Sequence, residues 1–160
     1  MDSDVIDHLM QRNELRQLES RRPSEASERI RAANIHLESA EILRKNDLND
    51  SFKLIYDAAR KIAEGALLTI GLRASSTGGD DALARAITAI FEEDFRDFDW
   101  IRRRRNEMRY SSLRRGGVRE PELDDAMRST LTMRSRLQTL INGEPVIDQS
   151  ISGRRDNRQL

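Results

Sequence analysis

The residues most able to do chemistry are the arginines of the segment 102–110. Arg102, Arg103, Arg104 and Arg105 stand next to one another, and Asn106, Arg109 and Tyr110 follow them. A guanidinium is planar and stays charged, so it can bind a phosphate through two parallel hydrogen bonds. Over residues 96–119 there are nine arginines and three carboxylates, although the whole chain, with 28 basic and 28 acidic residues, has no net charge. This local excess is a reason to expect an anionic partner.

On a helix, where successive residues turn by about 100°, the segment divides into two flanks. The apolar flank consists of Phe98, Ile101 and Met108. The polar flank consists of Arg102, Asn106 and Tyr110, and Arg105 and Arg109 fall between the two flanks. So many guanidinium groups on one helix repel one another unless carboxylates or a bound polyanion compensate them. The arginines are therefore either a nucleic-acid-binding surface or a helix face that is solvated or paired within the chain.

The elements that position this segment are predicted to be helices. Hydrophobic residues make up 37% of the chain and aromatic residues only 4%, a balance that favours helix faces over β-strands. Apolar residues recur at spacings of three and four over residues 24–45, 51–70, 80–91 and 121–141, and from residue 95 into the arginine segment. Short connections between these stretches predict an all-α, up-and-down bundle of four to five helices, and no run is typical of a strand.

The stretch 51–70 is the most apolar and is predicted to be the central helix. It contains several small residues that would let a neighbouring helix approach closely: Ala58, Ala59, Ala63, Gly65 and Ala66. Gly71 is placed to end this helix. Glu64 lies on it, and we expect its carboxylate to pair with an arginine of the segment 102–110.

The two ends of the chain differ from its middle. Residues 1–22 are predicted to form a peripheral N-terminal helix over residues 5–19, where the apolar stripe is incomplete. The bundle itself is expected over residues 23–143, with Pro121 at the start of the last helix and Asn142 and Gly143 as its stop signal. Residues 144–160 are polar and without periodicity, so we predict a disordered tail.

Two pieces of this sequence resemble the HEPN superfamily, a group of small helical bundles that includes many prokaryotic toxin and defence ribonucleases. Residues 56–68, closing at Gly71 and Leu72, are similar to the alanine-rich second helix of these bundles. Residues 105–110 are similar to the family signature, in which an arginine, often followed by asparagine, precedes a histidine a few residues further on. Tyr110 stands where the ribonucleases have that histidine.

The resemblance implies a HEPN-like bundle over about residues 24–143 that binds RNA or a nucleotide, in a toxin–antitoxin or phage-defence setting. The catalytic members cleave RNA without a metal, in a cleft between two subunits, which here would place Arg105, Asn106 and Tyr110 in the cleft of a homodimer. A tyrosine with a pKa of about 10 can donate a proton but is a poor base, so cleavage is left open. We expect the dimer contact near Phe95, Phe98 and Trp100, and a cognate antitoxin or defence protein as a partner. The alternative is a non-catalytic helical interaction module that binds a protein.

Other kinds of chemistry have little to build on. The chain has no cysteine and only two histidines, His8 and His36, so disulfides, thiolate nucleophiles and Cys-ligated zinc are excluded. We expect neither a metal nor another cofactor, and carboxylate-bound Mg²⁺ is the one metal site left open. No apolar run is long enough for a membrane span, and residues 1–12 are acidic and unlike a signal peptide. A cytoplasmic location without membrane contact is therefore expected.

Overall fold

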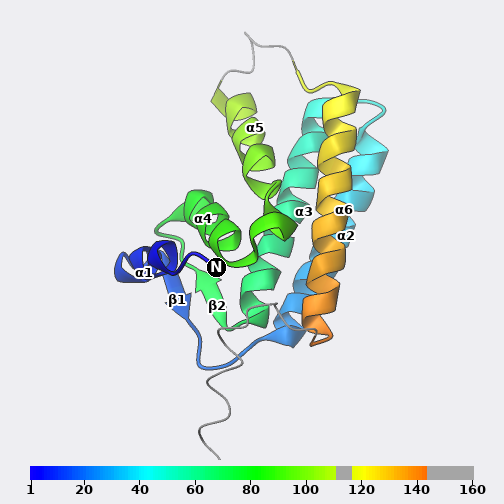
Figure 1. The fold of residues 1–160 in the computed structure, drawn as a ribbon. Coiled ribbons are helices and arrows are strands. Elements are labelled where there is room, and N and C mark those ends of the chain that lie inside the picture. The colour runs from blue at the N-terminus through cyan, green and yellow to red at the C-terminus, as the bar shows by residue number, and fades with distance from the viewer. Residues whose placement is uncertain (111–116, 144–160) are drawn as a thin grey trace, which may run out of the picture.

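The computed structural model describes residues 1–110 and 117–143, and of Arg109 and Tyr110 only the backbone; the predicted tail 144–160 lies outside the described residues. The described residues are mostly helical, which confirms the predicted all-α class, although they form six α-helices where four to five were predicted (Figure 1). They form six α-helices, a short 3₁₀ helix and two strands of three residues. In chain order these are α1 (Ser3–Gln11), β1 (Leu15–Gln17), α2 (Pro23–Leu43), α3 (Leu48–Thr69), β2 (Leu72–Ala74), α4 (Gly79–Phe91), η1 (Glu92–Phe95), α5 (Phe98–Tyr110) and α6 (Glu120–Ile141).

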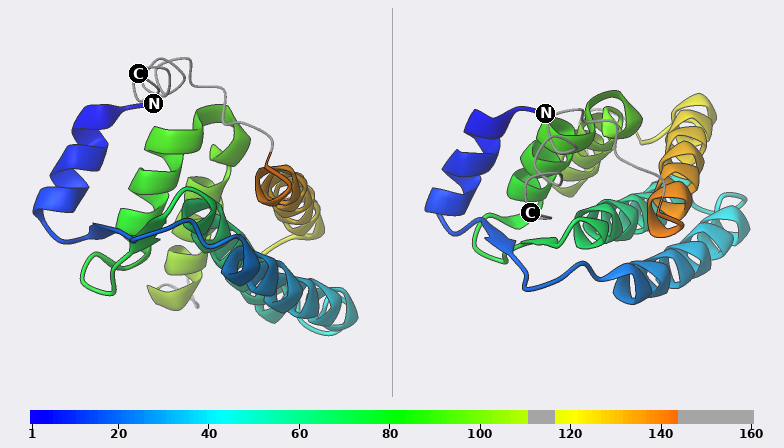
Figure 2. Two further views of the ribbon diagram at one scale, coloured as in Figure 1. Left: turned by 90° about the horizontal axis from the view of Figure 1, so that it is seen from below. Right: turned by 60° about the horizontal axis from the view of Figure 1, so that its bottom comes forward.

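Three long helices, α2, α3 and α6, pack together as a bundle (Figures 1 and 2). The Asp47 side chain accepts a hydrogen bond from Asp50 N–H and so caps the first turn of α3, which runs back along α2. The predicted close approach to the central helix is found at Gly65. A Cβ placed there would lie only 2.8 Å from Cδ2 of Leu137 on α6. Gly71, with φ at +77°, follows the end of α3 as predicted.

A second group of elements consists of α1, the two strands, α4, η1 and α5, and it packs on α3 through β2, α4 and α5 (Figure 2). Helix α1 is attached to α4, because Asp2 N–H donates to the carbonyl of Ala89 at 2.9 Å. Leu9 on α1 is fully buried in the common core. The hydrophobic core is therefore continuous from α1 to α6.

The predicted N-terminal helix over residues 5–19 is wrong beyond Gln11. Asn13 has φ at +56°, a left-handed conformation that asparagine tolerates, and this turn ends α1. Strand β1 then pairs antiparallel with β2, with Leu15 opposite Ala74. This pairing buries the Leu15 side chain, which continuation of the helix would have placed elsewhere. The expectation that no strand forms is corrected by this small sheet.

The apolar stretch 80–91 and the stretch that leads into the arginine segment form separate helices. Helix α4 ends at Phe91, and Glu92 has φ at +49°, which turns the chain into η1 before α5 begins. The turn brings the rings of Phe91 and Phe95 to 5.3 Å between centroids. Phe95 and Phe98 are both fully buried in the core. These two side chains are therefore not part of an exposed apolar face, contrary to expectation, whereas a dimer contact near the half-buried Trp100 stays a prediction.

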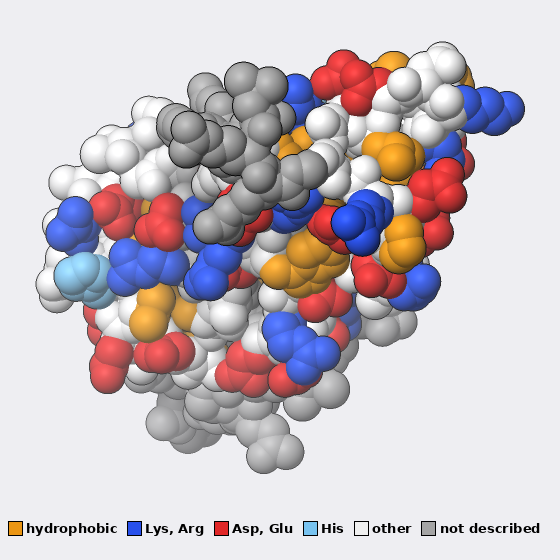
Figure 3. All heavy atoms as spheres, turned by 90° about the horizontal axis from the view of Figure 1, so that it is seen from above, with side chains coloured by type: hydrophobic (Ala, Val, Ile, Leu, Met, Phe, Trp, Pro, Cys, Tyr) orange, Lys and Arg blue, Asp and Glu red, His pale blue; other side chains and the backbone are white. Residues whose placement is uncertain are grey.

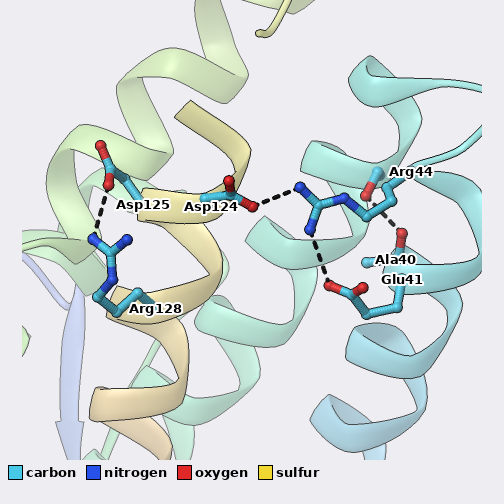
Figure 4. A network of polar contacts seen from close by, with 7 residues as sticks. Ala40, Glu41, Arg44, Asp124, Asp125 and Arg128 are labelled. Carbon is cyan, nitrogen blue, oxygen red and sulfur yellow. Dashed lines mark hydrogen bonds and ion pairs between the residues drawn. The ribbon is translucent and has the colours of Figure 1, made fainter. Parts of the chain in front are cut away.

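Ion pairs on the surface connect neighbouring helices and turns of the same helix, outside the hydrophobic core. Arg44, at the end of α2, contacts Asp124 on α6 at 2.5 Å and Glu41 on its own helix at 3.5 Å (Figure 4). Arg128 and Asp125 form a second pair on α6, at 2.9 Å. Such surface pairs each contribute at most about 1 kcal/mol, so burial of apolar side chains carries most of the stability.

The last helix has the signals at its ends that the sequence predicts. Pro121 lies in its first turn, Asn142 is its C-cap, and Gly143 has φ at +85°. Over residues 1–110 and 117–143, no helix combines the length and the apolar character that crossing a membrane requires.

Candidate nucleic-acid interface

Helix α5 is anchored at its start and presents polar residues toward its end. Phe98 and Ile101 are fully buried, and Met108 is half-buried against the core, which confirms the predicted apolar flank. The helix packs mainly on α3, with further contacts to α4 and α6. The arginines of the segment therefore lie on a rigid element whose orientation the core determines.

Arg102 is a structural residue in this fold. Its side chain is only 13% exposed and lies 2.8 Å from Asp99 on the same helix and 3.6 Å from Asp81 on α4. A guanidinium held by two carboxylates in this way connects α5 to α4. Arg102 was predicted to bind nucleic acid; its Nε and one terminal nitrogen are engaged with carboxylates within the chain, and binding to nucleic acid stays a prediction.

Arg104 has a similar role on the other side of the helix. Its Nε atom lies 2.7 Å from Glu122 on α6, and an Nη atom lies 3.4 Å from Glu107. The hydrogen bond to Glu122 is the main reason why the pKa of the Arg104 guanidinium lies above its ordinary value. With 17% of its side chain exposed, Arg104 connects α5 to α6.

Arg103 and Asn106 face the solvent. The side chain of Arg103 is 71% exposed and contacts Asp99 at 2.8 Å, so part of its charge is compensated. Asn106 is exposed as well. Both residues remain accessible to a ligand that approaches the outer face of α5.

Arg105 differs from its three neighbours in having no carboxylate partner in the described part of the chain. Its side chain is half-buried, and its Nε atom is buried without a hydrogen-bond acceptor among the described residues. Arg109 and Tyr110 belong to α5, but their side chains lie outside the described residues. The structure thus brings Arg105 and Asn106 together at the end of a helix and leaves the Tyr110 hydroxyl unplaced.

The surface around this helix carries both signs of charge. Acidic and basic side chains alternate over the face seen in Figure 3, and the described part of that face shows no continuous basic patch. Much of the arginine excess in the sequence is therefore compensated locally by carboxylates. A ligand would meet individual guanidinium groups on this face and no broad positive field.

A polar contact that the sequence did not predict lies beneath α5. The Tyr56 hydroxyl on α3 donates a hydrogen bond to Asp80 Oδ2 near the start of α4. The Tyr56 ring stacks on Phe98, with 6.2 Å between centroids. Burial is the main cause that raises the pKa of Tyr56, and the hydrogen bond to Asp80 raises it further. Since the two partners are separated by 24 residues, no local sequence pattern could have paired them.

Glu64 does not pair with an arginine of α5, contrary to expectation. It lies 3.1 Å from Arg29 on α2 and 3.3 Å from Arg60 on its own helix. In the part of the chain that the structure describes, no group of three or more histidine, aspartate or glutamate side chains is arranged to hold a metal ion. Comparisons with models of protein families, with curated proteins and with solved structures find no match to this chain.

Proposed function

We propose that this chain is a HEPN-like protein that binds RNA or a nucleotide through the outer end of α5, with Arg105 as the main phosphate contact. The observation that supports this most directly is which of the four adjacent arginines have a carboxylate partner. Arg102, Arg103 and Arg104 each have a carboxylate within the chain, and Arg105 has none among the described residues. Arg105 is also the arginine that matches the family signature.

The energetics favour an external acceptor for Arg105. Arg105 is half-buried and has no carboxylate partner among the described residues, so its terminal N–H groups can donate charge-assisted hydrogen bonds to a phosphate oxygen. Asn106 is the next residue and exposed, so its amide can donate to the same phosphate or to a base. Arg103 adds an accessible positive charge beside them.

Binding without cleavage is the form of this function that we propose. Tyr110 replaces the histidine of the signature and is a weak base at neutral pH. We expect the protein to act as a homodimer in the cytoplasm, in a toxin–antitoxin or phage-defence setting with a cognate protein partner. The alignment of Arg105 with the family signature is what supports these further expectations.

The test is fluorescence anisotropy with a labelled single-stranded RNA and a labelled nucleotide. Arg105→Ala should weaken binding about tenfold, because a hydrogen bond to a charged group is worth about 1.5–3 kcal/mol. Arg128→Ala removes an equal charge from an exposed pair on α6 and should leave binding unchanged. Equal affinities for wild type and Arg105→Ala would overturn the proposal.

A cleavage assay in EDTA separates binding from catalysis. We expect intact RNA after incubation with the wild-type protein. Cleavage that is lost in both Arg105→Ala and Tyr110→Phe would instead assign a metal-independent ribonuclease.

A second candidate is a helical interaction module that binds a protein. Ile35 and Ile42 are 63% and 73% exposed and lie seven residues apart, hence on one face of α2. We expect a second copy of the chain to cover this face if the module dimerises there. Ile42→Glu should then shift the protein to monomers in sedimentation, whereas a dimer that persists in this variant excludes the α2 face.

A further inference from the structure

A second group of arginines lies where α2, α3 and β2 meet, and no described residue of α5 lines the cavity beside it. It is formed by four arginines and two glutamates from α2, α3 and β2, which we call the arginine cluster: Arg22, Arg29, Arg60, Arg73, Glu25 and Glu64. Glu64 bridges Arg29 and Arg60, as described above. Glu25 contacts Arg73 at 2.5 Å and Arg22 at 3.8 Å. Because two carboxylates serve four guanidinium groups, the cluster keeps a net charge of +2.

The arginine cluster surrounds a cavity. A volume of about 190 Å³ is lined by residues of α2, α3 and β2, three of which are arginines: Arg29, Arg60, Glu64, Leu68, Arg73 and Ala74. A neighbouring volume of about 250 Å³ shares Arg60, Glu64 and Ala74 with it and extends to Ser75, Ser76, Asp80 and Leu83. The two volumes form one groove, with a basic end at the cluster and a mixed end between β2 and α4. Each is smaller than a typical drug-sized site of about 300–1,000 Å³, so each suits a single chemical group.

The basic end still has donors to offer. An arginine has five N–H donors, and each carboxylate contact in the cluster occupies only one or two of them. The Nε atom of Arg73 is buried and has no hydrogen-bond acceptor within residues 1–110 and 117–143. Guanidinium groups bind phosphate oxygens bidentately, and a phosphate monoester carries a charge of about −1.5 to −2 at neutral pH. The charge of this ligand therefore matches that of the cluster.

The mixed end has the chemistry that recognises a sugar. Ser75 and Ser76 provide hydroxyls, Asp80 provides a carboxylate that can accept from a sugar hydroxyl, and Leu83 provides an apolar surface. Gly79 also lines this end and begins α4, whose first turn has no side-chain cap. We propose that this groove binds a sugar or nucleoside phosphate, with the phosphate in the arginine cluster and the sugar toward the start of α4. The site is separate from Arg105 and does not depend on the function proposed for α5.

The substitutions at Glu64 and at the arginines should act in opposite directions. Glu64→Gln removes a carboxylate that competes for Arg29 and Arg60, so it should tighten phosphate binding. Arg60→Gln and Arg73→Gln should each weaken it about tenfold. Arg60→Lys keeps the positive charge but loses the planar group that binds phosphate through two hydrogen bonds, so it should also weaken binding. Because this variant keeps the charge that Glu64 faces, it provides a test of binding in case Arg60→Gln does not fold. Arg128→Gln on α6 is the matched control.

The experiment is calorimetric titration of the full chain with adenosine 5′-monophosphate, ribose 5-phosphate, inorganic phosphate and adenosine. We expect the two esters to bind at least tenfold more tightly than inorganic phosphate, adenosine not to bind, and Arg105→Ala to leave these affinities unchanged. Inorganic phosphate that binds as tightly as the esters would overturn the sugar part of the proposal. If no phosphate compound binds, or if Arg60→Gln, Arg60→Lys and Arg73→Gln all bind like wild type, the groove is not this site. Loss of ester binding in Arg105→Ala alone would assign the ligand to α5 instead.

Discussion

The Nε atom of Arg104 lies 2.7 Å from Oε2 of Glu122, and this contact joins α5 to the first turn of α6. The two residues are 18 positions apart, and the connection between their helices includes residues 111–116, outside the described part of the chain. The pair therefore helps to fix the direction of the helix that carries Arg105.

Glu122→Gln should lower the free energy of unfolding by about 0.5–1 kcal/mol, because Arg104 is mostly buried and would lose the charge that it faces. Asp125→Asn breaks the fully solvent-accessible pair with Arg128 and should change the stability by less. Urea unfolding of both variants measures the difference. Equal losses would mean that the α5–α6 contact is no stronger than an ordinary surface pair.

Two neighbouring arginines should respond very differently to removal. Arg102→Ala takes a nearly buried guanidinium away from Asp99 and Asp81 and should cost about 1–2 kcal/mol. Arg103→Ala removes an exposed side chain and should stay within about 0.5 kcal/mol of wild type. Thermal unfolding followed by circular dichroism compares them. A larger loss of stability in Arg103→Ala than in Arg102→Ala would contradict the conclusion that Arg102 stabilises the fold by connecting α5 to α4.

Tyr56 should make the protein sensitive to alkaline pH. Its pKa is raised above the ordinary value of 10.0 in the folded state, because burial and the bond to Asp80 favour the protonated phenol. The stabilisation is therefore complete below about pH 10 and is lost as the pH rises from there toward the folded-state pKa.

Tyr56→Phe should unfold more easily at neutral pH, by about 1 kcal/mol, and should show a flatter loss of stability at high pH. Tyr110→Phe serves as the control and should keep the wild-type alkaline slope. Urea unfolding between about pH 8 and pH 11 measures the slopes. An unchanged slope in Tyr56→Phe would show that other groups cause the alkaline loss.

RNA binding through α5 should weaken only moderately with salt. Arg102 and Arg104 are engaged within the chain, so of the four adjacent arginines Arg103 and Arg105 are the two left to displace counterions from the RNA. The slope of log affinity against log salt should therefore be about −1 to −2, and Arg105→Ala should reduce its magnitude by about 1. Anisotropy titrations at several salt concentrations give the slope. A slope steeper than about −4 would mean that more cations than Arg103 and Arg105 contact the RNA.

The sequence predicted the apolar flank of α5 and the small residues of α3, because helical spacing alone determines which side chains share a face. It could not separate Arg105 from the arginines before it. Asp99 and Glu107 pair with Arg102, Arg103 and Arg104 at helical spacing within α5, whereas the further partners Asp81 and Glu122 come from α4 and α6, and only the packing of these helices brings them to α5.

The spacing of apolar residues could predict neither the arginine cluster nor the pairing of β1 with β2. The arginine cluster draws on three elements, and its members Arg29, Arg60 and Arg73 are far apart in the chain. The strand at Leu15 forms because a backbone partner at Ala74 is available, and pairing across so many residues has no local signal. Such long-range contacts decide where an amphipathic helix stops.

The short sheet also indicates which part of the molecule unfolds locally first. The hairpin of α2 and α3 is closed by a few residues, whereas the β1–β2 ladder joins segments more than 50 residues apart. Local contacts form early in folding and distant ones late. The ladder and α1 should therefore detach as a unit while the three-helix bundle stays folded, and amide protons of residues 3–17 should exchange with solvent faster than those of α3.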